Sequence, residues 1–236
     1  MAFQGFPEAG LNFLTELGQN NNKEWFEAHK ETYIAHVQKP AVAFVIALGE
    51  KLRSIAPDVQ VDTRANGAGS LMRIHRDTRF SADKTPYKTA VAMMFWEGAG
   101  KKMESPAFGY HFEPHTGQSM AGIFAFPKHW LAAYREAVAD EKLGAELAEA
   151  VDTVQRLDGY TVGTQTFKRV PQGYPADHPR ADLLRYDGLH ATGPEIDRVT
   201  LMSPELVDVC FELARNMAPI QRWLLKLSER INSARD

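Results

Sequence analysis

The side chains best suited to chemistry gather in one short stretch of the sequence, residues 70–89. Positive charges outnumber negative ones there, and the local sum of +3 contrasts with −3 for the whole chain and −6 for the remainder. Arginine presents a planar fork of donors that fits phosphate or carboxylate, and lysine adds a point charge. The stretch therefore predicts an anion-binding loop. Its candidate ligand-binding residues are Arg73, Arg76, Asp77, Arg79, Asp83, Lys84, Tyr87 and Lys88.

Three interpretations of this loop stay open. In the first, the chain is a hydrolase or transferase acting on a phosphate- or carboxylate-bearing substrate, with Asp77 or Asp83 as the local candidate for a base. In the second, the loop belongs to a non-catalytic binding module for nucleic acid or a protein partner. In the third, the two aspartates pair with Arg76, Arg79 or Lys84, and the loop is a structural salt-bridge knot. No catalytic residue or cofactor is implied, so enzyme activity stays undecided.

A second candidate cluster is His111, Glu113 and His115, which share one face if the chain is extended there. Imidazole and carboxylate groups suit zinc or another divalent metal, and His75 could join them from a neighbouring strand. An ordinary solvated strand face accounts for the same residues, because Pro114 and the turn after it disturb the extension. The sequence therefore predicts no metal site.

Two further groups of polar residues also have an ordinary explanation. Asn20–Asn22 could line a polar pocket beside Trp25, but a helix cap followed by a hydrophobic anchor is favoured. His178 and His190 could exchange protons near neutral pH. They lie in the proline-rich residues 171–194, which are typical of an irregular surface loop.

Composition and motifs exclude several classes of protein. The phosphate-binding patterns GxxxxGK[ST] and GxGxxG are absent, as is the nucleophile pattern GxSxG. The single cysteine, Cys210, lies in an apolar helical pattern, which predicts a buried residue rather than a nucleophile. Without a secretory leader or a membrane-spanning run, we expect a cytoplasmic protein with no membrane partner. The acidic total argues against bulk nucleic-acid binding, while a local basic site and the oligomeric state stay open.

The order of the expected elements predicts a single α+β domain over residues 1–236, with helices, then a sheet, then helices. The sheet is expected to be an antiparallel meander of about four strands, because short turns join them. The expected strands are Leu71–Arg76, Thr89–Trp96, Ala107–Glu113 and Ser119–Phe126, with Tyr160–Val170 as a further candidate. Helices are expected around Leu11–Leu17, Lys23–Val37 and Glu141–Leu157, and after Pro40 and Pro127.

The sequence also predicts a long loop within the sheet and two helices near the C-terminus. The first two expected strands enclose a loop of about twelve residues, a length typical of functional or disordered loops. Phe80 and Tyr87 are expected to anchor this loop by their apolar rings, which favours order.

At the far end of the chain, one helix is expected to begin at Ser203–Glu205, and Pro219 is expected to start another.

Three motifs resemble those of a known family. The longest is residues 73–81 (RIHRDTRFS) with residues 83–88 (DKTPYK). The others are Gly5-Phe6 and Phe13-Leu14 followed by residues 20–26 (NNNKEWF), and residues 109–112 (GYHF) with Pro127 beyond. On these residues the chain resembles the domain of unknown function 2461 family, found in bacteria and fungi. It departs from the family pattern at His75, often an aromatic there, and at Ala90, often polar. The resemblance implies a soluble single-domain protein and adds no mechanism.

Overall fold

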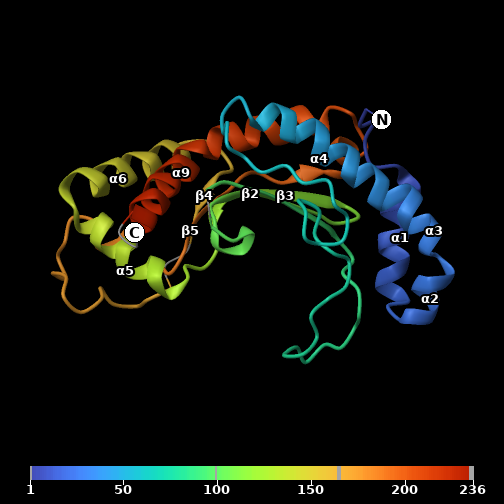
Figure 1. Cartoon of the computed structure of the whole chain (residues 1–236), viewed down its shortest axis with the longest axis horizontal. Coiled ribbons are helices and arrows are strands. Elements are labelled where there is room, and N and C mark those ends of the chain that lie inside the picture. The colour runs from blue at the N-terminus through green and yellow to red at the C-terminus, as the bar shows by residue number, and fades with distance from the viewer. Residues whose placement is uncertain (1, 99, 164–165, 234–236) are drawn as a thin grey trace. The chain divides into compact units, whose positions relative to one another are not determined.

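The computed structural model describes residues 2–98, 100–163 and 166–233 (Figure 1). The chain divides into two compact units, and each unit is assembled from three separate segments. Unit 1 consists of Met1–Phe95, Gly109–Ser119 and Glu195–Glu212, and unit 2 consists of Trp96–Phe108, Met120–Pro194 and Leu213–Asp236. A single domain over residues 1–236 stays a prediction. All of the predicted ligand-binding residues belong to unit 1.

Unit 1 begins with helices whose ends are set by local chemistry. The second helix is capped by Asn22, whose side-chain oxygen accepts a hydrogen bond from the Trp25 amide at 2.9 Å. The side chain thus satisfies one of the amides that a helix start leaves without a partner. The predicted helix cap is confirmed at Asn22. The helices of this part are α1 (Glu8–Gln19), α2 (Lys23–Ala28), α3 (Lys30–Tyr33) and α4 (Lys39–Leu52).

A π-helical turn, Ile34–Gln38, joins α3 to α4. The amide of Lys39 donates to the carbonyl of Ile34, five residues back, which is the π pattern. Pro40 comes immediately after it and has no amide hydrogen to contribute to a helix. The interruption expected at Pro40 is therefore a widened turn inside a continuous helical run.

The sheet confirms the predicted α+β class, with antiparallel strands and with helices toward both ends of the chain (Figure 1). The strand order is β1-β2-β3-β5-β4, and β6 pairs with β3. The first three strands form the predicted meander, but the described residues form six strands, because short strands come from residues 161–197. The strands are β1 (Val91–Trp96), β2 (Ala107–Phe112), β3 (Thr116–Ile123), β4 (Thr161–Val162), β5 (Leu189–Thr192) and β6 (Ile196–Asp197).

The strand β5 lies in a segment that was expected to be irregular. In unit 2 it pairs with β3 from Thr192 opposite Met120 to Leu189 opposite Ile123. The same segment also contains a short helix, α7 (Ala181–Leu184). The expectation of an irregular loop over residues 171–194 is wrong from α7 onward, because apolar side chains such as Leu184 and Leu189 are fully buried there.

The expected strand Leu71–Arg76 is wrong, because only two isolated bridges form along it. Leu71 bridges to Met93 and His75 bridges to Tyr87, both antiparallel. On the first segment the bridged residues, Leu71 and His75, are four positions apart. On the segment that returns, the bridged residues, Tyr87 and Met93, are six positions apart. The two extra residues on the returning side break the regular ladder, as a bulge does.

The expectation that Pro219 starts a new helix is also wrong. A continuous helix, α9 (Leu206–Ser233), has Pro219 inside it. An internal proline costs about 3 kcal/mol, whereas burial of a large apolar side chain stabilises by about 1.5–3 kcal/mol. Met217, Ile220 and Leu224 are all fully buried around the proline, and their burial outweighs the lost hydrogen bond.

Aromatic side chains form the centre of unit 1. The rings of Phe6 and Phe112 lie 5.7 Å apart between centroids, and those of Phe44 and Phe112 lie 5.4 Å apart, both edge to face. The hydroxyl of Tyr110 donates to the carbonyl of Cys210 at 3.0 Å. Cys210 is buried as predicted, and burial raises the pKa of its thiol, which leaves no reactive thiolate.

In unit 2, the side chains of buried aromatic residues join the helices by hydrogen bonds to backbone carbonyls. The hydroxyl of Tyr134 donates to the carbonyl of Leu183 at 3.0 Å, and the indole of Trp223 donates to the carbonyl of Leu143 at 2.9 Å. The remaining helices of the chain are α5 (Lys128–Ala139), α6 (Glu141–Gln155), α8 (Arg198–Leu201) and a 3₁₀ turn, Lys102–Glu104. None of the helices in the described part of the chain combines the length and the apolar character that a membrane crossing requires.

Candidate anion-binding arm

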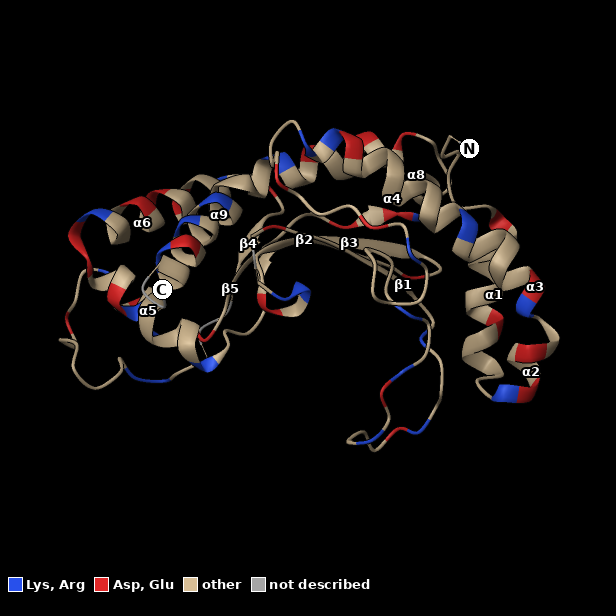
Figure 2. Ribbon diagram, viewed as in Figure 1, with Lys and Arg blue, Asp and Glu red and all other residues tan. Residues whose placement is uncertain are grey.

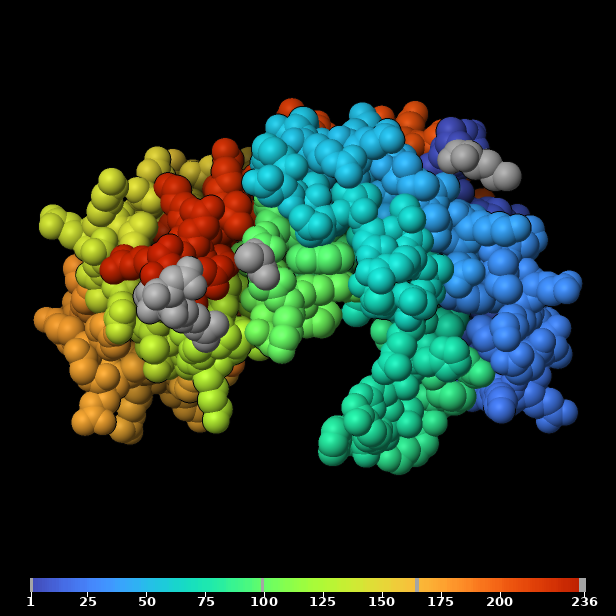
Figure 3. Space-filling model, in the orientation of Figure 1, coloured from blue at the N-terminus to red at the C-terminus, as the bar shows by residue number. Residues whose placement is uncertain are grey.

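The predicted basic loop is an extended two-stranded arm, which we define as residues 73–88. The amide of Arg76 donates to the carbonyl of Pro86 at 2.9 Å, and the amide of Lys88 donates to the carbonyl of Ile74 at 2.8 Å. Beyond these bonds the chain forms the tip of the arm, residues 77–85. Figure 3 shows this segment, in teal, standing out from the surface of unit 1.

Residues far away in the sequence hold the root of the arm. The side-chain amide of Asn21 donates to the carbonyl of Tyr87 at 2.9 Å, and its oxygen accepts from the Tyr87 amide at 3.0 Å. The ring of Phe26 stacks on the ring of Tyr87 at 4.1 Å between centroids, and the ring of His75 lies 5.1 Å from Tyr87. Tyr87 is buried, so its side chain anchors the arm as predicted and presents no surface to a ligand.

One end of the tip is closed around Asp83. This carboxylate accepts hydrogen bonds from the amide of Thr85 at 2.9 Å and from the hydroxyl of Thr85 at 3.0 Å, and it pairs with the guanidinium of Arg76. The amide of Thr85 and then the Arg76 guanidinium lower the pKa of Asp83 to about 2. The positive charge of Arg76 is therefore neutralised within the arm by the carboxylate of Asp83.

The other end of the tip is closed around Asp77. The guanidinium of Arg79 forms two parallel hydrogen bonds with this carboxylate, at 2.9 and 2.7 Å. The side chain of Arg79 lowers the pKa of Asp77 to about 2. Lys84 reaches across the tip and donates to the carbonyl of Thr78 at 2.8 Å. Two of the five cations are thus neutralised by aspartates, as the salt-bridge interpretation expects, but neither arginine is buried. Figure 2 shows the two signs alternating along the tip of the arm.

The cations at the base of the arm are in a different situation. Within the described ranges of the chain, neither Arg73 nor Lys88 forms an ion pair with a carboxylate. Lys88 is half-buried, and its pKa is lowered by burial and by the positive charge of Arg73. The two groups therefore raise the positive potential at one place, where an anion would relieve both the repulsion and the loss of solvation.

Phe80 does not have the role that the sequence suggested. It was expected to anchor the loop, but its side chain is 94% exposed at the tip. The guanidinium carbon of Arg79 lies 5.7 Å from the centre of its ring. The expected anchor is wrong at this position, because the arm extends beyond the apolar surface of unit 1 that receives Tyr87.

The other candidates from the sequence are not assembled into a site. The imidazole of His111 and the carboxylate of Glu113 approach only to 3.9 Å, and the described residues contain no group of three or more potential ligands that could hold a metal ion. In unit 1, the ring of Trp25 stacks on His29 at 4.1 Å. In unit 2, His190 lies 4.5 Å from the ring of Phe124, and burial lowers its pKa.

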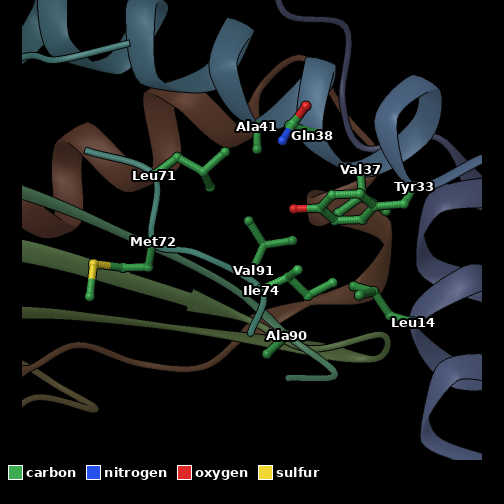
Figure 4. A pocket seen from close by; sticks show the side chains of 10 residues that line it. All are labelled: Leu14, Tyr33, Val37, Gln38, Ala41, Leu71, Met72, Ile74, Ala90 and Val91. Atoms are coloured by element: carbon green, nitrogen blue, oxygen red, sulfur yellow. The ribbon is translucent and has the colours of Figure 1, made fainter. Parts of the chain in front are cut away.

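A small cavity in unit 1 was not predicted from the sequence. Its volume is about 10 Å³, which leaves room for about one water molecule. Figure 4 shows that Tyr33 and Gln38, at the two ends of the π-helical turn, supply its polar groups. The cavity is too small for an organic ligand. Its lining residues are Leu14, Tyr33, Val37, Gln38, Ala41, Leu71, Met72, Ile74, Ala90 and Val91.

The anchors of the arm were also missed from the sequence. The sequence pattern indicates only a polar run or cap at Asn21 and a hydrophobic anchor within its own helix at Phe26. Asn21 meets Tyr87 across 66 positions of sequence, and no local pattern indicates such a pairing. Covariation between the two positions in an alignment would be the signal capable of finding it.

The pairing in the tip predicts an acid titration. The pKa of both aspartates falls from an ordinary value of 3.8 to about 2 in the folded chain, so their contribution to stability is complete above about pH 4. It is lost as the pH falls through 2. An NMR titration of the carboxyl carbons should give midpoints near 2 for Asp77 and Asp83, with Asp77→Asn and Asp83→Asn variants used for assignment. A midpoint near 3.8 for either group would contradict its pairing.

Comparison with known proteins adds one finding to this geometry. Residues 9–223 match the model of a protein family described as a conserved hypothetical protein, DUF2461. The matched range contains the whole arm and its anchors, Asn21 and Phe26. A search of curated proteins finds no match.

Proposed function

The chain belongs to the DUF2461 family of conserved hypothetical proteins, and on that premise we propose that it binds an anionic ligand through the base of its arm. The ligand carries phosphate or carboxylate. The observation that carries the proposal is the pair Arg73 and Lys88, two cations that influence each other and form no ion pair with a carboxylate within the described ranges. Asp77 is near enough for the charge of Arg73 to help lower its pKa, but Arg79 holds this carboxylate in two hydrogen bonds. Arg76 and Arg79 fix the shape of the arm, because aspartates already neutralise them.

The acidity of the aspartates favours a binding module over a hydrolase or transferase. A general base works best when its pKa lies near the operating pH. Asp77 and Asp83 have pKa values of about 2, so each is a poor proton acceptor at neutral pH. An enzyme built on this arm would need a base from another part of the chain. We place the module in the cytoplasm, in keeping with a single buried cysteine that has no partner for an intrachain disulfide.

A thermal-shift experiment tests the proposal. Phosphate, pyrophosphate, sugar phosphates and dicarboxylates are added to the intact protein. A ligand at a hundred times its Kd should raise the melting temperature by roughly 5–10 °C, because it binds only the folded state. The double variant Arg73→Gln, Lys88→Gln should lose more than half of that shift.

The control is Lys142→Gln, which removes an exposed lysine from α6 in unit 2 and should respond like the parent protein. The melting temperature of each variant without ligand shows that it folds. Equal shifts in the parent and the double variant would place the anion elsewhere. The absence of a shift with every anion would remove the proposed function.

A further inference from the structure

The tip of the arm presents an aromatic ring to solvent. Phe80 is 94% exposed, more than any other large apolar side chain of the described residues. Backbone contacts flank it on both sides: the amide of Arg79 donates to the carboxylate of Asp77 at 3.3 Å, and the amide of Ser81 donates to the carbonyl of Thr78 at 3.4 Å. A ring that is held in place before binding loses little conformational freedom when a ligand covers it.

Three cations that form no ion pair with any carboxylate of the described residues lie along the same arm. Lys84 is at the tip, and Lys88 and Arg73 are at the base. The chain from Arg73 to Phe80 has eight residues, or seven steps between Cα atoms, and is extended at its base, so it reaches up to about 25 Å. A single phosphate cannot occupy both ends of such a surface. A polymer with regularly spaced anions and flat rings can.

We propose that the arm binds single-stranded nucleic acid, with one base stacked on Phe80 and phosphates on Lys84, Lys88 and Arg73. This inference rests on the proposed anion site and names its ligand class. Aromatic stacking together with a basic track is how proteins hold single strands without reading their sequence. A duplex is a poorer ligand, because its base faces are covered by neighbouring base pairs.

The charges of the arm weigh against the main alternative, insertion of Phe80 into an anionic lipid surface. Asp77 and Asp83 flank Phe80 at three residues on either side, and both are ionised at neutral pH. Burying the ring among lipid headgroups would also take the two exposed ion pairs, Asp77 with Arg79 and Asp83 with Arg76, out of water. Stacking on a base covers the ring alone and leaves both aspartates in water.

Fluorescence anisotropy with labelled 12-nucleotide strands tests the inference. The probes are oligothymidylate, oligouridylate and an abasic 12-mer that carries the same phosphates without bases. Phe80→Ala should weaken binding of the two base-containing strands about 5- to 150-fold, and binding of the abasic strand should not change. Phe80→Trp should restore binding. Phe124→Ala, which removes another exposed ring in unit 2, should bind like the parent.

The salt dependence supplies a second readout. Three contacts between cations and phosphates predict a slope of about −2 for the logarithm of affinity against that of salt concentration. Removing Arg73 or Lys88 should each make this slope less negative by about 0.7. The remainder of the chain sums to −6, so it repels the strand and confines binding to the arm.

The outcomes separate this inference from the proposed function. If Phe80→Ala binds every probe like the parent while the double variant Arg73→Gln, Lys88→Gln loses all of them, the stacking inference is wrong and the anion site stands. If small anions shift the melting temperature and no strand binds, the ligand is a small molecule. If vesicles of phosphatidylserine and phosphatidylcholine bind through Phe80 and strands do not, the ligand is a lipid surface. If no anion of any kind binds, both proposals fail.

Discussion

Replacing Phe26 with alanine is expected to lower the free energy of unfolding by about 3–5 kcal/mol. The ring is 2% exposed and stacks on Tyr87 at 4.1 Å. It also lies 5.4 Å from the ring of Tyr33 and 6.3 Å from that of Phe13. Its removal leaves a cavity that these rigid rings cannot fill by small rotations. Unfolding in urea, monitored by the change in circular dichroism, measures the loss.

Phe80→Ala is the matched control, because it removes the same side chain from a position that is 94% exposed. A change of less than about 0.5 kcal/mol is expected there. Hydrogen exchange adds a local test: in Phe26→Ala, the amides of Arg76 and Lys88 should exchange faster, since the root of the arm has lost its stacking partner. Similar destabilisation by both substitutions would show that Phe80 is packed against the protein.

Replacing Gly122 with alanine is expected to cost about 2–5 kcal/mol, from two causes. The backbone there has φ of +129°, which side chains of L-residues rarely tolerate. A Cβ atom would also lie 2.2 Å from the carbonyl oxygen of Leu189 and 2.8 Å from the Cα of His190. Gly122 faces His190 across the β3–β5 pair, so the clash must push the two strands apart. Thermal or urea unfolding measures the cost.

Gly173→Ala separates the two causes. Its φ is +96°, but a Cβ atom there would meet nothing within 4 Å. Backbone strain alone predicts a cost of about 1–2 kcal/mol. Equal costs at Gly122 and Gly173 would mean that β3 and β5 approach less closely than the structure has them.

The general plan of the fold could be predicted because most of its elements have a local signature. Prolines, helix-capping residues and periodic apolar positions indicate the helices. A continuous apolar run indicates β1, alternation of aromatic and polar residues indicates β2, and a turn signal indicates the start of β3. The errors arose where distant residues decide the outcome. Pro219 looks like a helix start in isolation, yet buried neighbours such as Met217 and Leu224 carry α9 through it. No local pattern shows the two extra residues that break the ladder between Leu71 and His75.

The charge pattern of the sequence predicts where the site lies, but it does not predict which charges pair or which aromatic rings are buried. The density of cations in residues 70–89 predicts an anion-binding loop, and the nearby aspartates predict the pairing that the arm displays. The difference between Arg76, which is paired, and Arg73, which is not, depends on the fold of the tip. The same holds for the two aromatic residues: Tyr87 meets Phe26 from a distant helix, while Phe80 extends beyond any such partner.

The assembly of unit 1 from three segments has a consequence for the order in which the protein matures on the ribosome. The first 95 residues need later ones: the amide of Phe6 donates to the carbonyl of Leu201, and the oxygen of Asn12 accepts from Arg198. Translation proceeds at roughly 5–20 residues per second, so the 117 residues between 95 and 212 take about 6–23 s. During that interval the nascent chain carries an incomplete unit 1 with part of its apolar core exposed. Chaperones that shield nascent chains would therefore act on this protein before residue 212 has been synthesised.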